Sequence, residues 1–155
     1  MLAQYSQAIV STRCRERLHR DGLKKPRFHL TTFFDSQGTL SNAIPYPWVG
    51  DQKAIITDID CWDTPNGLYI IANLDSPWSH DINAFYQQQG FVDDHSHNPH
   101  LTLVKQATSP DLVPYRHLIG RAIVFSDHQH KSLSADRAQN TNNGNTLNKR
   151  SNVHE

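Results

Sequence analysis

The sequence predicts an α+β domain, and three observations lead to that class. Short segments rich in β-branched and aromatic residues alternate with stretches of Gly, Pro and Asn, which is typical of strands separated by loops. Two of these segments flank Asn66-Gly67, a pair that favours a tight hairpin turn. Only two segments carry the start and stop signals of helices. The 155 residues suffice for one domain with a sizeable core.

The expected elements follow in the order strand, helix, strand, loop, hairpin, helix, strand, loop, strand. The first helix ends at Asp21-Gly22, and the second begins at Ser76-Pro77 and ends before Gly90. Residues 36–51 lack periodicity and predict a long loop. Residues 134–155 are too polar to bury a core, so we expect one domain over 1–133 and a polar, disordered tail. The expected strands are 7–11, 27–34, 53–62, 68–74, 100–105 and 121–125, and the expected helices are 12–23 and 76–89.

The charge balance and the cysteines narrow the function classes. Lys plus Arg and Asp plus Glu both number 15, so no global field favours duplex nucleic acid or an anionic membrane. The two cysteines, without CxxC spacing, suggest neither a zinc cage nor a disulfide framework. The start of the chain has no signal-peptide pattern, and no stretch is long and apolar enough to span a bilayer. We expect a soluble, cytoplasmic protein that binds a small phosphorylated ligand.

One short pattern, His-Leu-Thr, occurs at residues 29–31 and again at 100–102, on two expected strands. Alternate side chains of a strand share a face. Each histidine should therefore point to the same side as its threonine, and the intervening leucine to the core. A single such pattern is usually structural, but two copies 71 residues apart in a short chain indicate a common function.

The residue types suit the cleavage of a phosphodiester. His29 and His100 can serve as a general base and a general acid, because the pKa of histidine lies near neutrality. The hydroxyls of Thr31 and Thr102 can donate hydrogen bonds to the non-bridging phosphate oxygens as charge develops. This chemistry requires no metal and no other cofactor. The sequence does not say which histidine is the base.

The two motifs resemble those of the 2H phosphoesterase superfamily, over roughly residues 3–132. The order of segments is most similar to the branch of phage anti-CBASS nucleases, which degrade the cyclic oligonucleotides that signal infection in bacteria. The resemblance implies two pseudo-symmetric lobes of antiparallel sheet with flanking helices around a central cleft. It implies that His29, Thr31, His100 and Thr102 are catalytic. It also implies that Tyr5 and Trp62 stack on the bases of the ligand, although each aromatic has packing in a core as an equal alternative.

The function that this resemblance implies is cleavage of 3′–5′ linkages in cyclic di- or trinucleotides, in the cytoplasm of a host cell if a phage encodes the chain. An RNA 2′,3′-cyclic phosphodiesterase or 2′,5′-phosphodiesterase is an alternative. A protein that sequesters nucleotides without turnover is a second alternative.

For three further groups of residues we favour a structural or surface role over a functional one. The histidines at 95, 97 and 100 could bind a metal, but no Cys or Glu completes the set, and a solvated loop explains residues 95–98 better. His128 and His130 are expected at the surface. The basic residues between 13 and 25 could steer anionic nucleotides, but a solvated helix face explains them as well.

Overall fold

The structure, a computed structural model, describes residues 3–37 and 43–133. Its elements are β1 (Ala3–Val10), α1 (Thr12–Arg20), β2 (His29–Asp35), β3 (Gln52–Thr64), β4 (Gly67–Asp75), α2 (Pro77–Gln88), β5 (His100–Ala107), the 3-10 helix η1 (Val113–Leu118) and β6 (Ala122–Leu133). Within these residues the strands form one antiparallel sheet in the order β2-β1-β6-β3-β4-β5. The predicted α+β class is confirmed. None of the helices in the described ranges is both long and apolar enough to cross a membrane.

The sheet consists of two three-stranded halves joined by a short ladder. The ladder pairs Gln52–Ile55 of β3 with Ala122–Phe125 of β6. In each half the chain runs strand, helix, strand: β1, α1 and β2 in one, and β4, α2 and β5 in the other. The second strand returns antiparallel to the first and lies at the outer edge. Both His-Leu-Thr motifs therefore begin an edge strand.

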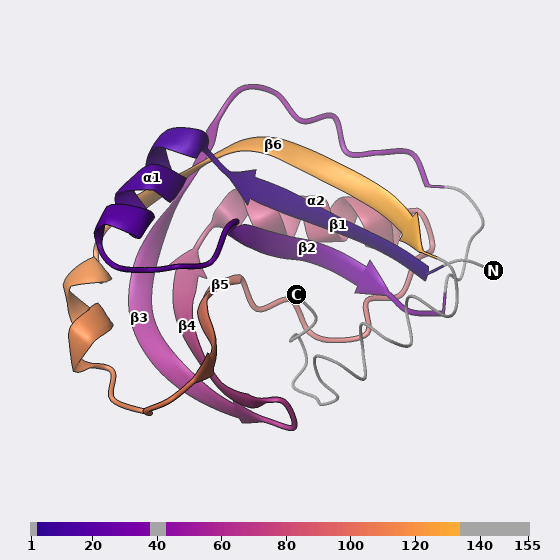
Figure 1. The fold of residues 1–155 in the computed structure, drawn as a ribbon. Helices are drawn as coiled ribbons and strands as arrows, with labels where there is room; N and C mark the ends of the chain where they lie inside the picture. The colour runs from indigo at the N-terminus through magenta and orange to yellow at the C-terminus, as the bar shows by residue number, and fades with distance from the viewer. Residues whose placement is uncertain (1–2, 38–42, 134–155) are drawn as a thin grey trace.

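The two edges of the sheet approach one another. The sheet is strongly curved, so that β2 and β5 come within 8 Å between Cα atoms although they are the first and last strands in the order (Figure 1). This curvature brings together two motifs that are far apart in the chain.

The core lies on the face of the strands opposite to the motif side chains. Leu30 and Leu101, the middle residues of the two motifs, are both fully buried in the main apolar cluster, as predicted. Cys14 and Leu18 of α1 belong to the same cluster. Helix α2 lies behind β1 and β2 in Figure 1 and contacts β2. A second cluster forms there from Phe33, Ile82, Tyr86 and Phe91.

Local sequence signals explain where the helices begin and end. The hydroxyl of Ser11 accepts a hydrogen bond from the backbone N–H of Cys14 and caps α1. Helix α1 ends at Arg20, three residues earlier than predicted, because the chain turns at Gly22 with φ +96°. Pro77 occupies the first turn of α2, where its missing N–H costs no hydrogen bond.

The last strand is longer than the sequence predicted. We expected it to end at residue 125, but β6 continues to Leu133 and pairs with β1 along the whole length of β1. The continuation, Asp127-His128-Gln129-His130, is polar and carries no apolar alternation, so its strand character comes from pairing with β1. The predicted tail at 134–155 lies outside the described residues.

Candidate active site

The four motif residues occupy equivalent positions on the two edge strands. His29 and Thr31 begin β2 and are half-buried. His100 and Thr102 begin β5 and are 8% and 4% exposed. Side chains two apart in a strand share a face, so each histidine lies beside its own threonine.

The first cavity brings residues of both motifs together. We name it the Thr31–His100 cavity, because Thr31 of β2 and His100 of β5 both line it. Its volume of about 30 Å³ holds roughly one water molecule. The remaining lining residues are Phe33, Phe34, Asp93, His95, Ser96, His97 and Asn98.

A second and larger cavity lies at the other motif histidine. This His29 cavity has a volume of about 430 Å³ and is lined by residues of β1, β2, β5 and β6 and of the segment before β2. The two cavities share no lining residue, but His29 and Thr31, which line one each, are only about 6.6 Å apart along β2. The lining residues are Tyr5, Gln7, Ile9, Lys25, Pro26, Arg27, Phe28, His29, Lys105, Gln129 and Lys131.

The hydrogen bond of His100 determines which of its nitrogens is available for proton transfer. Nδ1 lies 2.8 Å from the backbone oxygen of Asn98. A carbonyl oxygen only accepts hydrogen bonds, so Nδ1 carries the proton and Nε2 of the neutral ring has the free lone pair. Nε2 is therefore the atom of His100 that can take up or release a proton.

Of the two aromatic residues predicted to bind bases, one contacts His100 and the other lines the cavity at His29. The ring of Trp62 is 4.7 Å from that of His100 between centroids, with an interplanar angle of 55°. Tyr5 lines the His29 cavity and packs against Phe34 at 6.4 Å. Both side chains are half-buried, so each keeps a surface that a base can contact.

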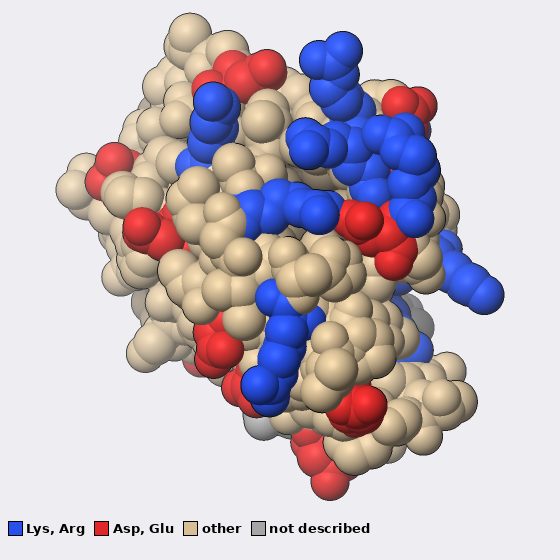
Figure 2. Space-filling model, turned by 90° about the vertical axis from the view of Figure 1, so that its left-hand side faces the viewer, with Lys and Arg blue, Asp and Glu red and all other residues tan. Residues whose placement is uncertain are grey.

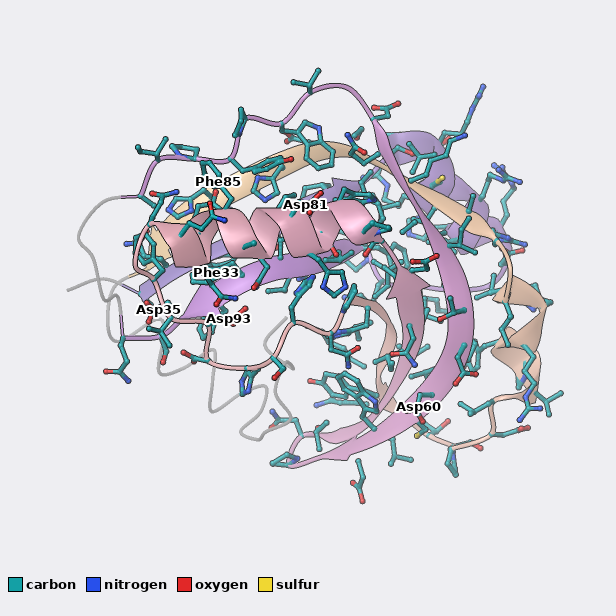
Figure 3. All side chains as sticks on the ribbon, turned by 180° about the vertical axis from the view of Figure 1, so that it is seen from behind. Phe33, Asp35, Asp60, Asp81, Phe85 and Asp93 are labelled. Atoms are coloured by element: carbon teal, nitrogen blue, oxygen red, sulfur yellow. The ribbon has the colours of Figure 1, made fainter. Side chains whose placement is uncertain are left out.

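Sequence analysis did not single out Asp93, which lines the Thr31–His100 cavity. One carboxylate oxygen accepts a hydrogen bond from the side-chain amide of Asn83, and the other accepts from the backbone N–H of His95. Burial raises the pKa of Asp93 to about 7. Asp35 and Asp93 lie at the same end of β2 beneath α2, whereas Asp60 lies far away towards the β3–β4 turn (Figure 3). The sequence signal was weak, because Asp93 precedes a second aspartate in an apparent loop.

The loop at residues 95–98 is only partly solvated, which corrects the expectation for it. His97 is largely buried, lies 2.9 Å from the hydroxyl of Ser79 through Nε2, and packs edge-on against His80. Burial, together with the nearby His80 and His100, lowers the pKa of His97 to about 3. Within the described ranges, no group of three or more His, Cys, Asp or Glu side chains is placed to hold a metal ion.

The expectation that His128 and His130 lie at the surface was wrong. Both pack on the helix-covered side of β6 and are half-buried. His128 stacks on Trp48 at an interplanar angle of 12° and lies 3.1 Å from the hydroxyl of Thr32. His130 stacks on Tyr86. Neither lines the two cavities at the motifs.

A search against models of protein families and a search of curated proteins found no match to the chain.

Proposed function

We propose that this protein is a phosphodiesterase that uses His29 and His100 as a general acid–base pair. The observation that carries the proposal is the meeting of the two motifs: Thr31 of one and His100 of the other line a single cavity. Two imidazoles and two hydroxyls on facing strands are the groups that an in-line displacement at phosphorus needs. The proposal includes a pseudo-symmetric relation between the two halves, as in 2H phosphoesterases.

In the reaction that we propose, the ribose 2′-OH of the substrate loses its proton to one histidine and attacks the adjacent phosphorus. The bond from phosphorus to the 2′-oxygen forms, and the bond to the 5′-oxygen of the next nucleotide breaks. The other histidine gives its proton to that leaving oxygen. The products are a 2′,3′-cyclic phosphate and a free 5′-hydroxyl, and water can open the cyclic phosphate by the reverse sequence of proton transfers.

Cyclic di- or trinucleotides are the substrates that we propose, with bacterial anti-phage signalling as the process that their cleavage would counter. Trp62 lies beside His100 and Tyr5 lies in the cavity of His29, so an aromatic ring stands at each end of the motif pair. A ligand with a base on either side of the cleaved phosphate could contact both rings. Stacking of a base on such a ring contributes about 1–3 kcal/mol.

The test is product analysis with three ribonucleotide substrates in excess EDTA: a cyclic dinucleotide, a linear RNA and a 2′,3′-cyclic mononucleotide. We expect the cyclic dinucleotide to be cleaved fastest. Faster cleavage of the mononucleotide would favour the alternative, an RNA-processing 2′,3′-cyclic phosphodiesterase. Tight binding of all three without turnover would reduce the function to sequestration.

A cyclic dinucleotide of deoxyribose tests the nucleophile. It lacks the 2′-OH, so we expect it to bind and to resist cleavage. Equal cleavage of the ribose and deoxyribose forms would contradict attack by the 2′-OH.

A further inference from the structure

We infer that the His29 cavity binds a second phosphate group of the substrate, separate from the phosphate that is cleaved. This inference rests on the proposed function and narrows it. The preferred substrate would carry at least two phosphates, as an oligonucleotide does, whereas a 2′,3′-cyclic mononucleotide carries one.

The charges around the cavity are of one sign. Four of its lining residues are cationic, namely Lys25, Arg27, Lys105 and Lys131, and no acidic residue lines it. The chain as a whole carries equal numbers of acidic and basic residues, so this local excess is not a consequence of composition. An anion bound in the cavity is attracted by each of the cations that line it.

The four cations come from separate parts of the fold. Lys25 and Arg27 belong to the segment between α1 and β2, Lys105 belongs to β5, and Lys131 lies on β6 opposite Tyr5. Helix α1 carries four arginines and one glutamate, and Figure 2 shows Lys and Arg side chains with acidic ones among them on the side of the molecule where α1 lies. The mixed surface of α1 differs from the cavity, where none of the charged lining residues is acidic.

An irregularity in β5 accompanies the position of Lys105. In a regular strand Lys105 would point to the face opposite to Thr102, because the two are three residues apart. The register of β5 against β4 shifts between Thr102 and Val104 and again between Val104 and Ala107, and Gln106 has a φ of +53°. Such bulges change the direction of side chains. Lys105 thus reaches the wall of the His29 cavity from the edge of the opposite half of the sheet.

The remaining polar groups also suit a phosphate. The side-chain amide of Gln7 donates to the side-chain oxygen of Gln129 at 3.3 Å, and both amides line the cavity. On β6, Asp127 pairs with Ile9, which lines the cavity. Asp127 itself is exposed and does not line the cavity. A volume of about 430 Å³ has room for a phosphate together with part of a sugar.

The deciding experiment compares two substrates on one variant. Lys105→Gln/Lys131→Gln should lower kcat/KM for a cyclic diribonucleotide about tenfold more than for a diribonucleoside monophosphate, which has a single phosphodiester. The matched control, Arg13→Gln/Lys53→Gln, removes two exposed cations outside the cavity. It should leave the ratio of the kcat/KM values for the two substrates unchanged. An equal loss on both substrates, or no loss on either, would overturn the inference.

A binding measurement separates this inference from the proposed reaction. Calorimetry with the deoxyribose cyclic dinucleotide and with a deoxydinucleoside monophosphate requires no turnover. We expect the Lys105→Gln/Lys131→Gln protein to bind the first about tenfold more weakly and the second with little change. In one outcome, the wild-type protein cleaves neither ribonucleotide while the variant still shows this selective loss of binding. That result would support the second-phosphate site and contradict the proposed reaction. If the variant binds both ligands as the wild type does, the site fails whatever the activity.

Discussion

The imidazole of His100 lies against the indole of Trp62, with 4.7 Å between the ring centroids. His100 is on β5 and Trp62 is on β3, and these strands are not neighbours in the sheet because β4 lies between them. The contact therefore reaches across a strand and limits the rotation of an imidazole whose Nδ1 is already bound to the backbone oxygen of Asn98. The aromatic residue that is predicted to hold a base thus also positions the imidazole that we propose as an acid–base group.

Trp62→Ala should therefore impair turnover as well as binding. We expect KM for the cyclic dinucleotide to rise through the loss of about 1–3 kcal/mol of stacking, and kcat to fall because His100 gains rotational freedom. Tyr5→Ala, whose ring packs against Phe34 instead, should change mainly KM. Steady-state kinetics on both variants check this, and an unchanged kcat in Trp62→Ala would contradict the positioning role.

Replacement of either motif histidine should abolish turnover in folded protein. His29→Ala and His100→Ala each remove a proton carrier, which typically lowers the rate by about 10²–10⁴-fold. His117→Ala removes an exposed histidine of η1 and serves as the control. Circular dichroism establishes folding and product chromatography measures the rate. Near-normal turnover in folded His100→Ala would rule out the paired mechanism.

The buried histidines make the protein less stable in acid. Burial lowers the pKa of His128 to about 4, below its ordinary value of 6.5. Between pH 6.5 and about 4 the unfolded chain binds a proton that the folded chain excludes, so the free energy of unfolding falls as the pH falls. His128→Gln keeps a polar partner for Thr32 and removes this titration. The fall in urea midpoint from pH 7 to pH 5 should be smaller in His128→Gln than in wild type or in His117→Gln.

Asp93 has the opposite effect on the pH dependence of stability: it makes the free energy of unfolding fall as the pH rises. Its pKa is raised from 3.8 to about 7, so the folded chain holds a proton that the unfolded chain loses between these values. The stability from this group is complete below pH 3.8 and is lost as the pH rises to about 7. The urea midpoint of Asp93→Asn relative to wild type should therefore rise from pH 4 to pH 7 and then level off. Asp94→Asn, at the exposed neighbouring position, should show no such trend.

Much of the fold could be predicted from the sequence because its strands and turns carry local signals. The β3–β4 hairpin follows from Asn66-Gly67, and the burial of Leu30 and Leu101 follows from alternation along a strand. The second half of β6 carried no such signal, since its polar residues become a strand only by pairing with β1. The burial of His128 and His130 could not be predicted for the same reason. It depends on Trp48 and Tyr86, which reach β6 from a loop and a helix distant in the chain.

The motif residues of the candidate site were readable from the sequence, but its surroundings were not. Repetition of His-Leu-Thr marks four side chains without any knowledge of the fold. The contribution of Asp93 and of Lys105 and Lys131 depends on long-range geometry: the packing of a loop under α2, a bulge in β5 and the extension of β6. No local sequence pattern predicts where these three side chains lie relative to the motifs.

The approach of β2 and β5 also bears on how the protein avoids self-association. An edge strand presents unpaired backbone N–H and C=O groups, to which a strand of another molecule can add, and this is a common route to aggregation. Here the two edges of the sheet face each other across the motifs, and Lys105 stands on one of them. The curvature that assembles the candidate site thus also makes the parts of the two edges that meet less accessible to a strand of another molecule.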